Sequence, residues 1–338
     1  MSLRRDSAGG TLFDVARLAG VSAQTVSRVA RGEANVAQHT REKVLTAMAS
    51  VQYRPNRAAR ALRTGRFGVI GLLTQHIWRT GEAYTSDGVV DEAAKLGYSV
   101  SLVQVHNPMS ADVHQAVARL SQQEIDGLVI VQAGLASSEH LALPEGLAVA
   151  SADLGSNAYP LVVSDHQQGV RAAVHHLLAL GHPTVHHITG ASDSRSAHRR
   201  QRLWEDALRE AGAPIPAPIP GDWTAHSGYE AGIRIADRRE VSAVFAANDE
   251  VALGLIRAFT ERGIGVPDEI SVVGYDGIEL AEFSAPPLTT VRQDFHRVGT
   301  AMVQLIHQQL TSELTTSQVI VPTELIVRSS TGPWRPRG

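Results

Sequence analysis

The sequence predicts a mixed α/β protein: a small all-α N-terminal unit, a short connecting helix, and a larger body of two doubly wound parallel sheets. Apolar residues recur at helix spacing over 11–50, whereas short apolar runs alternate with helical segments from Phe67 onward. The second pattern is typical of parallel sheets covered by helices on both faces. Charge divides at the same point, with a formal balance of +8 before Phe67 and −11 after it. The expected parts are 1–54, 55–66 and 67–338.

The composition narrows the classes of function. The sequence has no cysteine, which excludes disulfides, thiolate catalysis and cysteine-ligated zinc. The N-terminal stretch MSLRRDSAGGTLFDV lacks the apolar core of a secretory signal, and no apolar run reaches membrane-spanning length. We therefore expect a cytoplasmic protein with no membrane partner. The basic N-terminal part on an acidic body indicates a module that binds a polyanion.

Motifs for enzymatic or metal chemistry are not found. The sequence contains no G-x-S-x-G, no P-loop, and no G-x-G-x-x-G after a strand. Its fifteen histidines raise the question of metal binding. However, His186 and His187 are neighbours in an expected strand, so they point to opposite faces and cannot share one ion. We expect no enzymatic activity, no metal site and no cofactor.

The first helix is expected over residues 12–19. Thr11 and Asp14 have the spacing of a capping box, and Phe13 begins an apolar face at helix spacing. Gly20 follows the last residue with this spacing and can adopt the left-handed conformation that ends many helices. The sequence therefore predicts a short amphipathic helix with a tight turn after it.

The second helix is expected to begin after Ser22, a good N-cap residue. Val26 and Val29 are three residues apart and form its inner side. The outward positions are Ala23, Gln24, Ser27 and Arg28. Glutamine pairs well with adenine, and arginine with guanine, in the major groove of DNA. A third helix is expected over 40–50, where Leu45 and its neighbours close a small core.

A short connecting helix is expected within 55–65. Pro55 and Asn56 are typical helix-start residues, and Gly65 is a typical stop. About eight residues is shorter than an isolated helix needs to be stable in water. Docked with a second copy in a DNA minor groove, this helix would place arginines on phosphates and insert Leu62 between base pairs. The alternative is an ordinary arginine-rich linker.

The body offers polar residues where its expected strands end. Ligands of open α/β sheets bind outside the carboxyl ends of the strands. The polar residues at these ends are Asp153, Asn248, Asp249, Asp276, Gln293 and Asp294. With Arg200 and Trp223, they supply paired donors and acceptors for vicinal hydroxyls and a flat ring for an apolar face. The expected helices between the strands include 87–96, 168–180, 200–211 and 250–263.

The N-terminal motifs DVARLAGVSAQTVSRV and REKVLTAMASVQYRPNRAARAL closely resemble the DNA-binding signature of the lactose-repressor/galactose-repressor family of bacterial transcription factors. The resemblance covers nearly the whole chain. It implies DNA contacts from Thr11, Ser22, Ala23, Gln24, Thr25, Arg28, Asn35, Tyr53, Asn56, Arg57, Ala59 and Leu62. Ala23, Gln24 and Arg28 fall at base-reading positions. Ala23 departs from a larger aromatic residue in a family member, so the operator sequence is not carried over.

The body motifs GDWTAHSGYEAG, FAANDEVALGLIRA, ISVVGYDG and PPLTTVRQDFHRVG resemble the same family, which implies the bilobed fold of periplasmic sugar-binding proteins. The first lobe would span about 67–164 and 295–330, and the second about 165–294. Effector-contacting or pocket-lining positions match Asp153, Arg200, Trp223, Asn248, Asp276, Gln293 and Phe295. By this likeness Arg200, Asn248 and Asp276 bind hydroxyls and Trp223 stacks on the sugar. Arg199 and Arg202 are alternatives to Arg200.

The first lobe departs further from the family, in the segment TQHIWRTGEAYTSDG. It brings Gln75, Trp78 and Tyr84 to the expected pocket, and Val131 lies near a position that is polar in a family member. The added rings indicate a second ring-stacking subsite, hence a disaccharide or an aryl glycoside as the effector. The alternative is that Trp78 packs against the other lobe or a dimer partner.

The resemblance implies a sequence-specific repressor whose binding to double-stranded operator DNA is relieved by a small sugar. A β-galactoside or another disaccharide or glycoside would be that effector. The alternatives are a corepressor-dependent regulator or activator of the same family, or a sugar-binding transport receptor. The C-terminal stretch TGPWRPRG has no leucine heptad, so we expect a homodimer without a tetramerisation tail. Binding DNA, it would associate with the nucleoid.

Overall fold

The computed structural model describes residues 10–30, 35–53, 65–105, 115–116, 118–120, 124–131, 143–152, 159–312 and 318–335. The chain divides into two units, Met1–Phe67 and Gly68–Gly338. The division falls one residue after the expected end of the connecting segment. The connecting helix expected within 55–65 lies outside the described residues, apart from Gly65.

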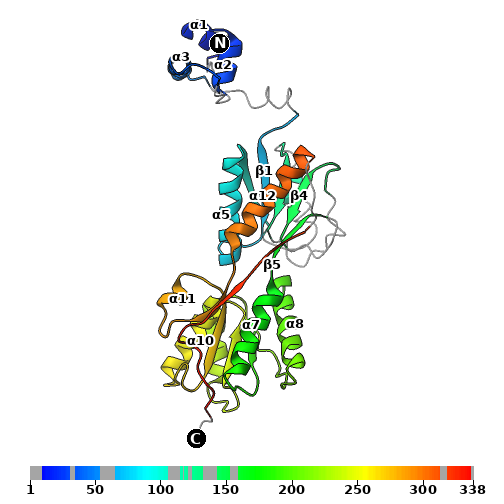
Figure 1. The fold of residues 1–338 in the computed structure, drawn as a ribbon, viewed down its shortest axis with the longest axis vertical. Coiled ribbons are helices and arrows are strands. Elements are labelled where there is room, and N and C mark those ends of the chain that lie inside the picture. Colours follow the sequence, from blue (N-terminus) through cyan, green and yellow to red (C-terminus); the bar gives the residue numbers. More distant parts are fainter. Residues whose placement is uncertain are drawn as a thin grey trace, which may run out of the picture. The chain divides into compact units, whose positions relative to one another are not determined.

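The N-terminal unit contains three helices, α1 (Leu12–Ala19), α2 (Ala23–Ala30) and α3 (Gln38–Ser50) (Figure 1). The capping box is present: Thr11 Oγ1 accepts from the Asp14 amide, while Asp14 accepts from the Thr11 amide at 3.0 Å. Gly20 ends α1 in the left-handed conformation, with φ 65°. This conformation costs glycine little because it has no Cβ.

The core of this unit is smaller than the sequence pattern predicts. Val15, Val26, Val29 and Val44 are buried together between the three helices. Phe13 and Leu45, which we expected to join this core, are 74% and 51% exposed. Leu45 directly follows the buried Val44, and Phe13 lies two residues before the buried Val15. A helix turns by about 100° per residue, so these positions point away from the inner face.

The first sheet of the body has the strand order β10-β5-β4-β3-β1-β2, with every adjacent pair parallel. Its strands are β1 (Val69–Thr74), β2 (Ser99–Gln104), β3 (Gly127–Ile130), β4 (Ala148–Ser151), β5 (Leu161–Ser164) and β10 (Gln318–Val321). Two helices, α5 (Thr80–Lys95) and α12 (Phe295–Thr311), pack against each other and share an apolar cluster with one face of this sheet.

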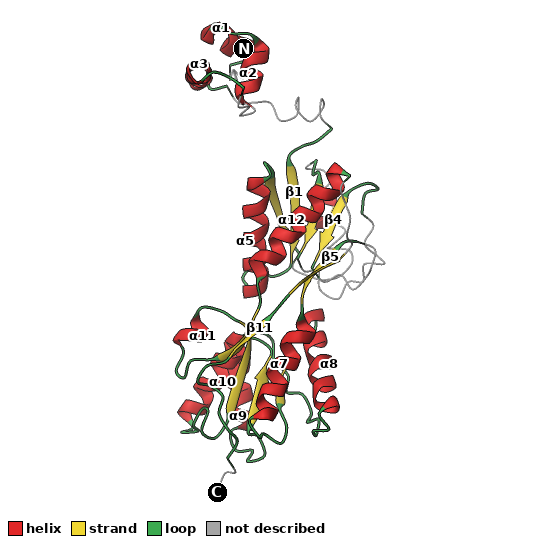
Figure 2. Ribbon diagram, in the orientation of Figure 1, coloured by secondary structure: helices red, strands yellow, loops and turns green. Residues whose placement is uncertain are grey.

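The second sheet has the order β11-β9-β8-β7-β6. It contains β6 (His186–Ile188), β7 (Ala243–Ala246), β8 (Ser271–Asp276), β9 (Thr289–Arg292) and β11 (Glu324–Ile326). Its helices are α7 (His166–Ala179), α8 (Arg195–Glu210), α9 (Ala225–Ile235), α10 (Asp249–Glu261) and the short α11 (Leu280–Phe283). Figure 2 shows the strands of each lobe beside helices.

Alternation along the strands explains why the second sheet has helices on both faces. On β7, Val244 belongs to the apolar cluster formed with α9 and α10, whereas Phe245 belongs to the cluster formed with α7 and α8. Neighbouring residues in a strand point to opposite faces, so a strand that is apolar throughout needs cover on both sides. This doubly wound α/β arrangement confirms the predicted fold class.

The C-terminal segment differs from the expected return to the first lobe over 295–330. β10 does join the first sheet, but β11 pairs antiparallel with β9 in the second. Pro322 lies between these two strands and cannot donate a ladder hydrogen bond, so it ends the first pairing. The chain therefore passes between the lobes three times: after β5, after β9 and after β10.

Helix α5 also differs from expectation, because it begins at Thr80 rather than at residue 87. Part of the segment expected to form a loop is therefore the first two turns of a helix. No helix in the described part of the chain is long and apolar enough to cross a bilayer.

Candidate functional site

A cavity of about 340 Å³ lies between the two lobes of the body. This volume is within the range of small-molecule sites. The first lobe lines the cavity from the start of α5, the ends of β4 and β5, and the start of α12. The second lobe lines it from the start of α8 and the residues that follow β7 and β8. The cavity is thus bordered by carboxyl ends of parallel strands, as the sequence predicts.

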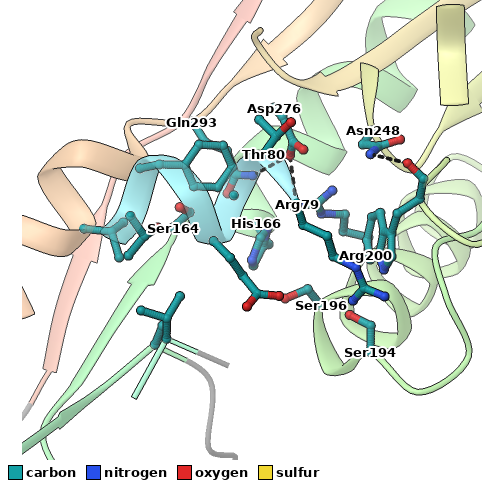
Figure 3. A pocket seen from close by; sticks show the side chains of 18 of the residues that line it. Arg79, Thr80, Ser164, His166, Ser194, Ser196, Arg200, Asn248, Asp276 and Gln293 are labelled. Atoms are coloured by element: carbon teal, nitrogen blue, oxygen red, sulfur yellow. Dashed lines mark hydrogen bonds and ion pairs between the residues drawn. The ribbon is translucent and has the colours of Figure 1, made fainter. Parts of the chain in front are cut away.

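Asp276 is a hydrogen-bonding centre of the cavity. Its Oδ1 accepts from Gln293 Nε2 at 2.7 Å and from Arg200 Nη2 at 3.2 Å, and Figure 3 shows both contacts as dashed lines. Asp276 is the last residue of β8 and has a positive φ of 107°, which is rare for a residue other than glycine. Such backbone strain is found preferentially at functional sites.

Burial controls the charge on this aspartate. It raises the pKa of Asp276 to about 7, with Arg200 acting in the opposite direction and Glu250 in the same one. The Arg200 and Asp276 side chains are only 5% and 8% exposed. A buried pair of this kind is costly to break, because removing one partner leaves an uncompensated charge.

Arg200 is the arginine of α8 that contacts the aspartate, which distinguishes it from the alternatives Arg199 and Arg202. Its guanidinium lies 4.0 Å from the ring centroid of Tyr275 and 5.2 Å from that of Trp223. One further amino group donates to the carbonyl of Ala247. Arg199 also lines the cavity, but Arg202 does not.

Trp223 is held by the turn that precedes α9. It has a φ of 77°, and its carbonyl accepts from Asn248 Nδ2 at 3.0 Å. A Cβ added at Gly190 would lie 2.3 Å from the indole, so a glycine is needed for this close approach. Asn248 also caps α10, because its Oδ1 accepts from the Val251 amide at 3.0 Å. Asn248 therefore orients the tryptophan as well as lining the cavity.

The cavity brings together most of the residues expected to contact an effector. Those that line it are Trp78, Arg200, Trp223, Asn248, Asp276, Gln293 and Phe295, and Val131 lines it too. Trp78 is 63% exposed, and its ring centroid lies 5.5 Å from the Arg79 guanidinium. Asp153 lies outside the described residues.

Two expected residues do not line this cavity. Gln75 is only 2% exposed. Its backbone amide donates to Glu82 at 2.9 Å, and its backbone carbonyl accepts from Gln104 Nε2 at 3.0 Å. These two hydrogen bonds hold the backbone of Gln75 against the first sheet. Tyr84 is 50% exposed and borders a second cavity instead. The earlier start of α5 explains this, because Gly81 and Thr85 share the face toward the first cavity.

Several further lining residues were not among the predicted site residues: Arg79, Thr80, Glu82, His166, Ser194, Ser196 and Glu250. Burial lowers the pKa of His166 well below 6.5, with Arg200 and Arg199 acting the same way. The imidazole is therefore neutral, and its Nδ1 lies 3.1 Å from the Tyr275 hydroxyl. The sequence predicted this helix only from residue 168. A predicted start at His166 would have placed this residue at the end of a strand, among the candidate site residues.

Asp249 has a structural role that its position at a strand end does not reveal. It is fully buried. Its Oδ2 accepts from the amides of Gly277 and Ile278, each at 2.8 Å, and its Oδ1 accepts from the Thr290 hydroxyl at 2.5 Å. Burial raises its pKa to about 8. Asp249 thus holds the backbone just after Asp276, a residue that lines the cavity.

The N-terminal unit presents the outward side of α2 as expected. Gln24 is exposed, and Ala23 and Arg28 are partly exposed. Ser22 Oγ accepts from the Thr25 amide at 3.1 Å, and Thr11 caps α1, so these hydroxyls position the helices. Asn35 is exposed, whereas Tyr53 packs against the small core. Asn56, Arg57, Ala59 and Leu62 lie outside the described residues.

Within the described residues, one group of three side chains has the spacing of a cation site: Asp87, Asp91 and His296. All three are exposed, and His296 Nε2 lies 3.1 Å from Asp91 Oδ2. They lie on the facing helices α5 and α12, outside the residues that line the interlobe cavity. The exposed hydrogen bond between His296 and Asp91 accounts for this group without a metal.

Three helices with a tight turn, followed by a bilobed α/β body with a polar interlobe cavity, define a DNA-binding regulator with a ligand-binding body. Comparison with known proteins agrees. Residues 11–56 match the family of bacterial regulatory proteins named for lacI, and residues 174–331 match a periplasmic binding protein-like domain. The chain belongs to the lacI family of bacterial transcriptional regulators.

Named relatives support this assignment over nearly the whole chain. The lactose operon repressor of Escherichia coli K12 is 35% identical over 332 residues, 95% of this chain and 90% of the relative. DegA, a transcriptional regulator of Bacillus subtilis, is 32% identical, with 96% and 98% covered. PurR, a transcriptional repressor of Haemophilus influenzae, is also 32% identical, with 95% and 98% covered. These relatives are regulators rather than enzymes.

Solved structures show the same architecture. The lac repressor dimer bound to operator and the anti-inducer ONPF superposes with a TM-score of 0.83 at 33% identity, covering 96% of this chain and 99% of that one. A complex of the regulator CelR with cellobiose gives a TM-score of 0.71 at 29% identity, with 95% and 99% covered.

Proposed function

We propose that this protein is a homodimeric transcriptional repressor whose hold on operator DNA is released by a sugar bound between the lobes. The observation that carries the proposal is the arrangement of Asp276, Arg200 and Gln293 beside the Trp223 indole. This site occurs in a chain whose N-terminal unit belongs to a DNA-binding family. The protein would act in the cytoplasm, on the nucleoid, and would need no cofactor.

The chemistry of the cavity suits a carbohydrate. A carboxylate that already accepts from a guanidinium and an amide is oriented to accept from ligand hydroxyls as well, and the guanidinium donates to their oxygens. The Trp223 ring offers an apolar face for the C–H side of a pyranose. Asn248 and His166 add further polar groups on the second lobe.

The DNA side of the proposal rests on α2 and the segment after α3. Gln24 and Arg28 of α2 would read base edges, with Ala23 beside them. Asn56, Arg57, Ala59 and Leu62 would contact DNA from the connecting segment, with Leu62 as the wedge. Two copies would read a near-palindromic operator, as the lac repressor dimer in complex with operator suggests.

The two sites would be coupled through the relative position of the lobes. Thr80, in the first lobe, donates to Glu250 in the second across the cavity. A sugar that contacts both lobes favours one lobe arrangement over the other, and it can shift operator binding only by this difference in affinity. Release would follow from separation of the paired connecting helices.

A corepressor-dependent mechanism is the second candidate, because the family resemblance does not fix the sign of the ligand effect and the relatives include transcriptional repressors of another name, PurR. The sign of the ligand effect distinguishes the two. A sugar that weakens operator binding supports the proposal, whereas a ligand that tightens it supports corepression.

The test begins by selecting operators from random duplex DNA with the full-length protein. A panel of mono- and disaccharides is then screened by thermal shift, and each ligand found is added to the operator complex while fluorescence anisotropy is followed. We expect at least one sugar to stabilise the protein and release the operator. Failure to bind any duplex at low ionic strength would overturn the proposal.

A further inference from the structure

The cavity contains charged atoms that have no hydrogen-bond partner. Nε and Nη1 of Arg79, Oε1 of Glu82 and Oε2 of Glu250 are buried and unpartnered within the described part of the chain. All three residues line the cavity. Arg79 and Glu82 come from the start of α5 in the first lobe, and Glu250 comes from the first turn of α10 in the second.

Both carboxylates are fixed by their other oxygen, so the unpartnered atoms have defined places. Glu82 Oε2 accepts from the amides of Gln75 at 2.9 Å and His76 at 2.7 Å. Glu250 Oε1 accepts from the Thr80 hydroxyl. Arg79, whose backbone precedes α5 as its N-cap residue, extends among the lining side chains in Figure 3.

A ligand part that lies against the start of α5, where Thr80 meets Glu250, must satisfy these charged atoms. A buried charged group without a partner is costly, and the cost stays if an apolar ring displaces water from it. Hydroxyl groups can pair with both kinds of charged atom, since a hydroxyl group donates to a carboxylate and accepts from a guanidinium. The apolar lining residues Val162 and Phe295 suit either an aromatic ring or a pyranose face, so they do not discriminate.

We infer that the effector carries a polyhydroxylated second ring held by Arg79, Glu82 and Glu250, so that it is a disaccharide rather than an aryl or alkyl glycoside. This inference rests on the proposed function, because it places the first ring against Trp223 and Asp276. Two of the three residues, Arg79 and Glu82, belong to the segment in which the first lobe departs further from its family.

The experiment compares matched ligand pairs that share their first ring. The pairs are lactose with phenyl β-galactoside, cellobiose with phenyl β-glucoside, maltose with phenyl α-glucoside, and melibiose with phenyl α-galactoside. Binding to the full-length protein is measured by calorimetry, and operator release is measured in parallel. For the pair that binds, we expect the disaccharide to bind about tenfold or more tightly than the phenyl glycoside, since each hydrogen bond to a charged group contributes about that factor.

Replacement of the arginine tests the assignment. Arg79→Leu is expected to lose at least about tenfold in affinity for the disaccharide while phenyl glycoside binding stays the same or improves. Arg79→Lys, which keeps the charge, should recover part of the loss. Arg257→Leu is the control, because Arg257 is an exposed arginine paired with Glu261 on α10, away from the cavity. Melting temperature and operator affinity confirm that each variant folds.

The outcomes separate the two proposals. A phenyl glycoside that binds the unaltered protein as tightly as its disaccharide, or an equal loss of both ligands in Arg79→Leu, overturns the second-ring assignment alone. Operator binding without any response to a sugar in the panel overturns the sugar-responsive mechanism, and the assignment with it.

Discussion

At the scale of single residues, the site shows polar side chains that serve two purposes at once. Asn248 lines the cavity, caps α10 and holds the Trp223 carbonyl. Asp276 lines the cavity and binds Arg200 and Gln293. Such residues couple ligand binding to local folding, so their substitution affects both. The choice of substitution therefore decides what each experiment measures.

Replacing Asp276 with alanine should give a protein that binds operator but no longer responds to sugar. The change removes the acceptor shared by Arg200 and Gln293 and leaves the arginine buried without its partner, at a cost of about 3 to 5 kcal/mol in the free energy of unfolding. Operator binding and sugar-induced release are measured by anisotropy below the lowered melting temperature. A sugar response like that of the unaltered protein would place the binding site elsewhere.

Arg28→Ala should reduce the free energy of operator binding by about 1 to 3 kcal/mol and relax preference at one base pair in each half-site. The physical reason is loss of paired hydrogen bonds to a base edge. Binding to a set of operators with single-base changes provides the measurement. If the loss were equal for every sequence, including nonspecific duplexes, Arg28 would be a phosphate contact instead.

The buried Asp249 should make stability depend on pH. Burial raises its pKa from 3.8 to about 8 in the folded protein. Between these values the folded state holds a proton that the unfolded state has lost, so the free energy of unfolding falls as pH rises, by at most about 1.4 kcal/mol per pH unit. Asp249→Asn mimics the protonated acid. Its melting temperature should vary less over pH 5 to 8, and an unchanged slope would contradict this prediction.

At the scale of elements, the local signals in the sequence predicted helix ends better than helix faces. The capping box at Thr11 and the stop at Gly20 are where the sequence indicates, because capping depends on neighbours within four residues. Phe13 and Leu45 follow the apolar pattern yet face solvent, because which face is buried depends on packing between helices. The early start of α5 was missed since its N-cap residue, Arg79, makes no side-chain cap hydrogen bond.

The candidate site was predictable where strand ends and family motifs coincide, as at Asn248, Asp276 and Gln293. It was not predictable for Arg79 and Glu82, which reach the cavity only because α5 starts before the expected position. Glu250 is brought opposite Thr80 by the approach of two lobes, a contact between residues 170 positions apart in the sequence. No local pattern carries that information.

The loop between β6 and α8 should be sensitive to one added methyl group. Gly190→Ala would place its Cβ 2.3 Å from the Trp223 ring, so the indole must shift out of its present position. We expect sugar affinity to fall by about tenfold or more, as a misplaced stacking ring costs about 1.5 kcal/mol, with operator affinity unchanged. Calorimetry with the best ligand provides the measurement, and Gly212→Ala, in an open turn, is a comparison for general destabilisation. Unaltered sugar binding would show that the ring has no role in it.

At the scale of the whole molecule, the division at residues 67 and 68 separates the two proposed activities. Each unit has its own apolar core. In the first unit the inner faces of three helices form the core, and in the second unit helices cover two sheets. The proposed sugar site is built entirely from residues of the second unit. We therefore expect the second unit to bind its ligand without the first.

A fragment comprising residues 68–338 should fold and bind sugar with nearly the affinity of the full chain, but should not bind operator. All residues that line the cavity belong to this fragment. Calorimetry and anisotropy provide the two measurements, with the full-length protein as the reference. Sugar binding weaker by more than about tenfold would indicate that the N-terminal unit contributes to the site.

The three passages of the chain between the lobes restrict how the molecule can respond to a ligand. Because three covalent connections join the lobes, we expect the lobes to rotate about these connections rather than to separate. β1 begins at Val69, directly after the connecting segment, and its opposite end leads into the cavity through Thr74 and Gln75. We therefore expect a rotation about these connections to move the start of β1, where the connecting segment joins the body, farther than the cavity end of the same strand.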